Sequence, residues 1–339
     1  MLRLLSEVEQ GAGVTINELM SRLNYRRGVI DKALKLLEVD GAIIRDGTTY
    51  VRTANSWTPD LIRSDQVTQN RRAELEEMQR YVDHPGCLME FLARALDDPS
   101  PVPCGKCMNC SRQSMRQLIP RELIHGAIEF LRGDDVRFET RKQWPGAIAE
   151  IQQAMPNAVG LTKQGKPSRK IPDYLRAEQG RALSVYGDAG WGRAVAEGKY
   201  RLNHFRDELV QATATLVRDR WQPDPFPEWI TCVPSNRNPL LVSDFAQRLA
   251  LELRIPFRPV IEKVRETEPQ KLMENSTQQV RNLLATFLVS RDILHAPVLL
   301  VDDVIDSRWT ITIITALLRI KGGGPVFPFA LAKATAGDS

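Results

Sequence analysis

The sequence of 339 residues lacks the long apolar runs that would cross a membrane. No run approaches the ~18 consecutive apolar residues that a spanning helix needs. The opening stretch, MLRLLSEVEQ, is too acidic and its apolar run too short for a secretory leader. These absences predict a cytoplasmic protein that does not contact a membrane.

Cysteine is also scarce, with five residues in the whole chain. An odd number argues against a disulfide framework, and four of the five fall between positions 87 and 110. Such crowding favours a metal site in a reducing compartment. The fifth, Cys232, lies in the apolar run ITCV, where we expect an inert buried thiol.

Several catalytic patterns are missing. The four histidines are scattered, and no Ser-His-Asp or paired Glu arrangement is visible. The run from Gly160 to Lys166 has the spacing G-x4-G-K, but Pro167 follows it and offers no hydroxyl for Mg²⁺. Without an Asp-Glu box or a strand before Gly160, we expect no ATP hydrolysis by this chain.

What is present is ordinary folded-protein composition, with 42% apolar and 26% charged residues. The length predicts two or three domains. The net charge of +4 permits a nucleic-acid partner without requiring one. By segment the charge is +1 for residues 1–58, −3 for 59–110, +5 for 111–200 and +1 for 201–339, so the basic excess lies in the middle.

The first segment, residues 1–58, has three helical patterns followed by a β-hairpin. We expect helices at 1–8, 16–23 and 26–40, with Thr15 and Glu18 as a capping box. The third helix shows an apolar stripe made of Val29, Ala33, Leu36 and Leu37. It ends at Gly41, and Asp46-Gly47 predicts a two-residue turn.

This pattern resembles a winged helix, in which the start of the third helix and the wing meet DNA. The resemblance implies phosphate contacts at four arginines, although exposed charge without a ligand is the alternative. They are Arg26, Arg27, Arg45 and Arg52.

The second segment, residues 59–112, predicts a helical hairpin and a zinc module with four cysteine ligands. Cys87, Cys104, Cys107 and Cys110 have the spacing C-x16-C-x2-C-x2-C, which suits four thiolates around a structural Zn²⁺. An iron–sulfur cluster and four unrelated core thiols are the alternatives. With the preceding run MQRYVDHPGCLMEFLARALDD, residues 72–112 resemble the zinc-binding subdomain of RecQ-family DNA helicases. In that family the zinc module comes before the winged helix, whereas here it follows.

Residues 113–200 have no clean period, and we expect a small basic α+β domain. Its basic loop is either solvated or in contact with DNA. The candidate contacts are Lys163, Lys166, Arg169 and Lys170.

The last segment, residues 201–339, alternates strands and helices and predicts a parallel α/β sheet with ligand chemistry at the carboxyl ends of its strands. The run VLLVDDVIDSRWT reads as a strand that ends in two carboxylates before a helix. It resembles type I phosphoribosyltransferases, and most of all their ComF-like branch. Further matches are Pro234, Arg265, Thr267, Gln270, Arg281, Asn282 and Phe287.

The phosphoribosyltransferase resemblance implies that Asp302 and Asp303 hold ribose hydroxyls, and that the following loop binds a phosphate. The loop candidates are Asp306, Ser307, Arg308 and Thr310. The family has Thr-Thr-Gly-x-Thr there, so a neutral turn has gained a carboxylate and lost its glycine. This departure predicts a non-catalytic domain. Phosphoribosyl transfer with Mg²⁺ and phosphoribosyl pyrophosphate is the alternative.

Together these resemblances imply the DNA-binding part of a RecQ-like 3′–5′ DNA helicase involved in DNA repair, with an appended phosphoribosyltransferase-like domain. The motor is absent from this chain and is expected in the same full-length protein, so it is uncertain whether this chain is itself an enzyme. The implied partner is DNA, whether duplex, forked or single-stranded, and we expect a monomer. A winged-helix transcription regulator is a further alternative, which should dimerise.

Overall fold

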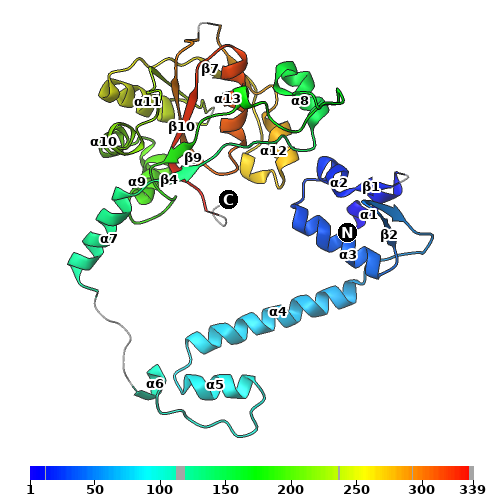
Figure 1. Ribbon diagram of the computed structural model, residues 1–339. Coiled ribbons are helices and arrows are strands. Elements are labelled where there is room, and N and C mark those ends of the chain that lie inside the picture. The colour runs from blue at the N-terminus through cyan, green and yellow to red at the C-terminus, as the bar shows by residue number, and fades with distance from the viewer. Residues whose placement is uncertain (12, 112–118, 236, 292, 336–339) are drawn as a thin grey trace. The chain divides into compact units, whose positions relative to one another are not determined.

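Figure 1 shows the computed structural model of the chain, which describes residues 1–11, 13–111, 119–235, 237–291 and 293–335. Its contacts divide into two compact units. One joins residues 3–54 to 125–339, and the other contains 1–2 and 55–124. The predicted boundary between residues 112 and 113 lies outside the described residues, and the four-part domain division stays a prediction.

Residues 2–52 form the predicted three helices and hairpin, called here the winged-helix-like segment. Its elements are α1 (Leu2–Glu9), β1 (Val14–Thr15), α2 (Ile16–Arg22), α3 (Arg27–Val39), β2 (Ile43–Asp46) and β3 (Thr49–Arg52). The strands pair antiparallel in the order β1-β3-β2. The capping box is present, because the Thr15 hydroxyl accepts from the Glu18 N–H while the Glu18 carboxylate accepts from the Thr15 N–H.

Two details of this segment differ from expectation. The buried face of α3 is formed by Ile30, Leu34 and Leu37, while Val29 and Leu36 are half exposed. The apolar residues of α3 lie on two adjacent faces of the helix, and each face has helical spacing. Packing against the neighbouring helices buries the face that carries Ile30 and Leu34. The hairpin turn lies one residue later than predicted, at Gly47 and Thr48, because Asp46 pairs with Thr49. Gly47 has φ +58°, the left-handed conformation that glycine adopts without strain.

The rest of this unit is an α/β body around a five-stranded sheet. The sheet contains β4 (Val136–Phe138), β5 (Gly180–Ala182), β6 (Trp229–Cys232), β9 (Val298–Ile305) and β10 (Val326–Lys333). Their order is β4-β5-β10-β9-β6, and all neighbours are parallel except β4 with β5. A separate antiparallel hairpin joins β7 (Ile261–Lys263) to β8 (Phe287–Val289).

Helices accompany both faces of the sheet (Figure 1). Helices α10 (Asp207–Thr215) and α11 (Pro239–Leu253) pack on one face and α13 (Trp309–Ile320) on the other. The remaining helices are α7 (Arg121–Gly133), which has no buried residue, α8 (Ile148–Ala154), α9 (Gly192–Glu197) and α12 (Ser276–Leu283). Short 3₁₀ or π turns lie at Pro156–Ala158, Asp173–Leu175, Gly198–Leu202, Leu216–Trp221 and Gln270–Leu272.

Alternate residues of each strand supply two hydrophobic clusters. Val298 and Leu300 of β9 pack in one cluster with α13, while Leu299 and Val301 pack in the other with α10 and α11. A strand that is buried on both faces reads as a continuous apolar run, which explains the sequence VLLV. The expectation of a mixed α/β fold with a parallel-rich sheet is confirmed.

Within residues 119–200, which the structure describes, the segment expected to be a separate α+β domain has no sheet of its own. Its strands β4 and β5 extend the main sheet, with Arg181 and Ala182 paired to Phe329 and Ala330 of β10. Trp144 and Ile151 from the same segment are fully buried in the cluster that contains α13. These partners lie well over a hundred residues along the chain, so no local pattern indicated them.

The winged-helix-like segment is joined to the α/β body through the end of α2 and the start of α12. Asn275 is 5% exposed, and its side-chain amide donates to the carbonyls of Leu23 and Tyr25 at 2.9 and 3.1 Å. Its side-chain oxygen caps α12 by accepting from the N–H groups of Thr277 and Gln278. One buried side-chain amide thus forms hydrogen bonds with backbone groups that follow α2 and with backbone groups at the start of α12, two elements far apart in the sequence.

Charged side chains surround this buried amide. The Arg26 guanidinium lies 2.6 Å from the Glu274 carboxylate. Arg281 bonds to both the hydroxyl of Ser21 and the carboxylate of Glu150.

The other unit consists of a long helix, α4 (Leu61–Val82), followed by α5 (Leu88–Ala95) and the short α6 (Met108–Ser111). Helices α4 and α5 form the predicted hairpin, in which the Tyr81 and Phe91 rings lie 5.7 Å apart. Among the described residues of 55–124, Cys87 is the single buried residue. In the part of the chain that the structure describes, no helix is long and apolar enough to cross a membrane.

Candidate metal centre and ligand cleft

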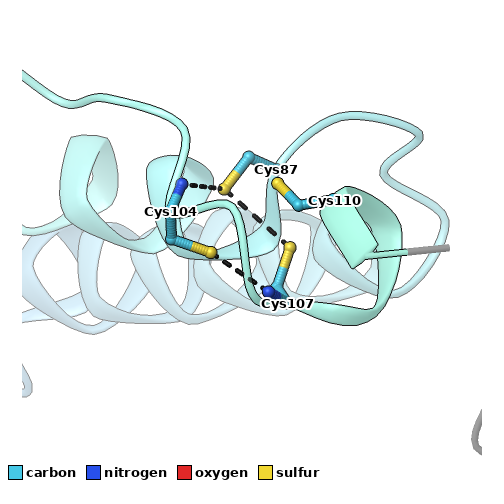
Figure 2. Close-up of side chains that lie close together, drawn as sticks. All are labelled: Cys87, Cys104, Cys107 and Cys110. Carbon is cyan, nitrogen blue, oxygen red and sulfur yellow. Dashed lines mark hydrogen bonds between the residues drawn. The ribbon is translucent and has the colours of Figure 1, made fainter. Parts of the chain in front are cut away.

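The four cysteines predicted to bind metal converge on one point. Their sulfur atoms all lie within 4.8 Å of one another, and the side chains point toward a shared centre (Figure 2). The Cys107 and Cys87 sulfurs are 3.9 Å apart. Zn–S bonds of about 2.3 Å at tetrahedral angles place sulfurs about 3.8 Å apart. The donor set and its spacing therefore fit a tetrahedral zinc ion.

Local backbone geometry positions each thiol. Cys87 is the N-cap of α5, where its sulfur accepts from the Glu90 N–H at 3.4 Å. The sulfurs of Cys87 and Cys104 also accept from the N–H groups of Cys104 and Cys107, both at 3.2 Å. Gly105 has φ +70°, which lets the chain turn tightly between two ligands.

Hydrogen bonds shift the pKa values of two of the thiols in opposite directions. The N–H of Cys110 donates to the Cys107 sulfur and is the main reason that the pKa of Cys107 is lowered to about 6. The pKa of Cys110 is raised to about 12, chiefly by its side-chain hydrogen bond to Cys107. The thiolate is the form of cysteine that binds a metal, and a lowered pKa favours it.

Asn109 fastens the cysteine knuckle to the helical hairpin. Its side-chain amide donates to the carbonyls of His84 and Gly86, at 2.6 and 2.8 Å. His84 also packs against Phe91, with ring centroids 5.0 Å apart. The tight loop between the two helices is thereby held close to the metal ligands.

A cleft of about 900 Å³ opens in the α/β body beside Asp302 and Asp303. Strand β9 does not end at these carboxylates, as the sequence suggested, but continues to Ile305, which pairs with Lys333 of β10. Strand β10 runs beside β9 as far as Lys333, so the hydrogen-bonded pairing of the two strands continues past the acidic pair. The cleft is also lined by Lys263 of β7 and Phe287 of β8.

The acidic pair interacts with a lysine that the sequence did not single out. The Lys199 ammonium lies 2.8 Å from the Asp303 carboxylate. Burial, together with the charge of Asp303, raises the pKa of Asp302 to about 7 against the opposing effect of Lys199. Lys199 precedes Asp303 by about a hundred residues, and no sequence pattern connects them.

The structure brings part of the predicted phosphoribosyl set into the cleft. Asp302, Asp303 and Thr310 line it, and so do the further matches Pro234, Thr267, Gln270 and Phe287. Asp306, Ser307 and Arg308 are not among the lining residues. Arg308 has φ +68° at the N-cap of α13, and its guanidinium donates to the Glu139 carbonyl at 3.3 Å. Arg281 forms the ion pair with Glu150, and the Asn282 amide donates to the Glu268 carbonyl.

The predicted DNA contacts have differing surroundings. Arg52 has 21% of its side chain exposed, lies 2.9 Å from Glu9 and donates to the Ala42 carbonyl. Arg27 lies 3.7 Å from Asp31, and Arg45 is exposed on the wing with its Nε donating to Gly47. Arg52 thus stabilises the hairpin, while Arg45 keeps an open surface.

The basic loop is exposed. Lys163 and Lys166 lie in a turn closed by a bridge between Leu161 and Pro167. The Lys170 ammonium is 3.5 Å from Asp173, and Arg169 donates to the Trp144 carbonyl.

Cys232 lies apart from the metal centre. It is buried in β6, and burial raises the pKa of its thiol to about 12. A thiol of this acidity stays protonated and unreactive.

Comparison with known proteins finds one family and a distant structural likeness. The comparison with curated proteins finds no relative. The crystal structure of adenine phosphoribosyltransferase from Leishmania tarentolae is 16% identical over 38% of this chain and 72% of that one, with a TM-score of 0.27. Residues 49–111 match the family described as RecQ zinc-binding, and this stretch contains all four clustered cysteines. The chain therefore contains a RecQ-like zinc-binding region.

Proposed function

We propose that this chain is the DNA-binding part of a RecQ-like helicase, in which a structural zinc ion holds the hairpin of α4 and α5. The observation that carries the proposal is the coincidence of the family match at residues 49–111 with four sulfurs within 4.8 Å. Translocation and unwinding would require an ATPase motor, and this sequence has neither a complete P-loop nor an Asp-Glu box.

Charge indicates which part would meet DNA. Residues 59–110 carry a net charge of −3, whereas 111–200 carry +5. A phosphate backbone favours the basic segment. We therefore assign the zinc region a structural role, and place DNA contacts on the wing at Arg45 and on the basic loop at Lys163 and Lys166. Arg26 would have to leave Glu274 before it could bind a phosphate.

The proposal is tested by fluorescence anisotropy with forked, duplex and single-stranded DNA. Phosphate binding releases counterions, so affinity should fall steeply between ~50 and ~200 mM salt. The triple substitution Arg45→Gln, Lys163→Gln and Lys166→Gln should weaken binding to all sequences alike and flatten the salt dependence. The double substitution Arg193→Gln and Lys321→Gln removes exposed cations outside the assigned surface and is the control. Equal losses in both variants, or affinity independent of salt, would contradict the assignment.

Zinc is tested separately by elemental analysis of the purified chain. One zinc per chain is expected, lost on Cys107→Ser and retained on Cys232→Ala. Iron in place of zinc would identify a different thiolate centre.

A second proposal concerns the cleft beside Asp302 and Asp303, to which we assign a phosphoribosyltransferase-like origin without catalysis. The carboxylate pair lines a cleft of suitable size, which supports the resemblance of its sequence to type I phosphoribosyltransferases. Two features oppose catalysis: Lys199 already neutralises Asp303, and Asp306 stands where a phosphate would meet a neutral turn. Calorimetry with phosphoribosyl pyrophosphate and Mg²⁺ tests this proposal. Turnover of that compound with any nucleobase would overturn it.

A further inference from the structure

A second cavity, of about 410 Å³, lies where the winged-helix-like segment meets the α/β body. It shares no lining residue with the cleft beside Asp302 and Asp303. The side chains that matter here are Arg27, Arg141, Lys142, Trp144, Arg169 and Trp309. The family match does not reach residues 141–309.

The lining of this cavity is positively charged. It includes four cationic side chains and no carboxylate. Two of the four have acidic neighbours outside the cavity: Lys142 lies 2.6 Å from Glu139, and Arg27 lies 3.7 Å from Asp31. Arg141 and Arg169 donate their Nε–H to carbonyls of Ser307 and Trp144, and within the described residues neither lies within 4.0 Å of a carboxylate. A carbonyl satisfies a donor but does not neutralise the guanidinium charge, and the Asp306 carboxylate offsets that of Arg141 only in part.

A buried donor in the same cavity also lacks an acceptor. Trp309 is 2% exposed, and its Nε1–H has no hydrogen-bond partner among the described residues. Its ring stacks on that of Trp144 at 6.2 Å, and the Arg141 guanidinium lies 5.4 Å from the Trp309 ring centroid. An unpaired buried donor costs free energy, so an acceptor that reached it would be favoured.

We propose that this cavity binds the phosphoryl group of a nucleotide, either free or within a nucleic-acid strand. Arg141 and Arg169, which have no carboxylate within 4.0 Å among the described residues, supply charge that a phosphate needs, and planar guanidinium groups match its oxygens in pairs. The volume lies in the range of small-molecule sites. Burial and the neighbouring Arg308 lower the pKa of Arg141, and a bound anion would offset both effects.

This proposal does not rest on DNA binding by the wing or the basic loop. If the assigned DNA surface failed its test, the cavity could still bind a free nucleotide. If the cavity bound nothing, the wing and loop assignment would stand.

The test is isothermal calorimetry on the intact, zinc-loaded chain with inorganic phosphate, thymidine 5′-monophosphate, thymidine and a short oligothymidylate. Phosphate and the monophosphate should bind, and thymidine should not. The double variant Lys142→Gln and Arg169→Gln should lose about tenfold or more in affinity, since each charged hydrogen bond is strong. The matched control, Arg193→Gln with Lys321→Gln, removes two exposed cations that line neither the cavity nor the assigned DNA surface, and should leave affinity for every phosphorylated probe unchanged.

Trp309→Phe gives a milder test that preserves the stacked ring. It removes the unpaired donor, so affinity for phosphate should fall while the Tm of the ligand-free protein is unchanged or rises. The oligonucleotide distinguishes the two sources of the phosphoryl group. Oligonucleotide binding that is lost with the cavity variant identifies a strand, and mononucleotide binding alone identifies a free nucleotide. Equal affinities in the cavity and control variants, or no binding of any phosphorylated probe, would overturn the proposal.

Discussion

The two units of this chain are stabilised in different ways. The α/β body buries large apolar side chains in two clusters, one on each face of its sheet. The unit of residues 55–124 has one buried residue among those described, and that residue is the metal ligand Cys87. In the first unit burial of apolar area drives folding, whereas in the second the metal must replace the missing core.

Removing the metal should have the largest effect, and it should be confined to one unit. Structural zinc binding contributes about 10 to 16 kcal/mol to folding in small domains. A chelator, or Cys107→Ser, should therefore expose residues 61–111 to hydrogen exchange while β9 and β10 stay protected. Cys232→Ala is the control, since it lies in the α/β body and should leave zinc binding intact. Loss of protection in both units together would show that the two units do not fold independently.

The reverse experiment removes apolar contacts from the body. Leu300 is fully buried in the cluster with α13, so Leu300→Ala should cost about 2 to 5 kcal/mol. Denaturant unfolding of the body measures this loss, and elemental analysis should still find one zinc. Leu288→Ala, at a side chain that is 56% exposed, should change stability by no more than about 0.5 kcal/mol. A variant that loses zinc together with body stability would argue against independent units.

The stability of the α/β body should depend on pH through Asp302, a residue of this unit alone. Burial and Asp303 raise the pKa of Asp302 from its usual 3.8 to about 7. The folded state therefore holds a proton that the unfolded state has released, and stability should fall as pH rises from about 4 to about 7. Asp302→Asn should flatten this decline in thermal unfolding of the α/β body. An unchanged slope would exclude Asp302 as its source.

The smallest expected effect is at Gly105, whose φ of +70° shapes the turn between Cys104 and Cys107. A Cβ there has nothing within 4 Å, so Gly105→Ala adds conformational strain without a clash. The cost should be about 1 to 2 kcal/mol and should appear as weaker zinc affinity in a chelator competition. Gly126→Ala also adds a Cβ into open space but at a helical position, and should leave zinc affinity unchanged.

Most of the features that the sequence predicted correctly depend on local patterns. The capping box at Thr15, the helices of the winged-helix-like segment and the four cysteines depend on neighbours within a few tens of residues, and the structure has them as expected. The prediction of which face of α3 is buried was wrong, because the helix carries apolar residues on two adjacent faces.

Long-range contacts account for the rest. Strand β5 has three residues, too few for a periodic signal, and it is a strand because it pairs with β10. Helix α12 is polar along much of its length and is held by Asn275 against α2. The lysine beside Asp303 and the cavity around Trp309 arise in the same way, from segments that only the folded chain brings together.

The zinc-binding region is an insertion in the other unit, because residues 54 and 125 on either side of it both belong there. If its metal is lost, these ends are joined by a flexible loop of 70 residues. Closing such a loop costs about 4 kcal/mol of chain entropy. The contact between α2 and α12 lies outside this loop, so its own hydrogen bonds at Asn275 must offset the closure cost whether or not zinc is bound.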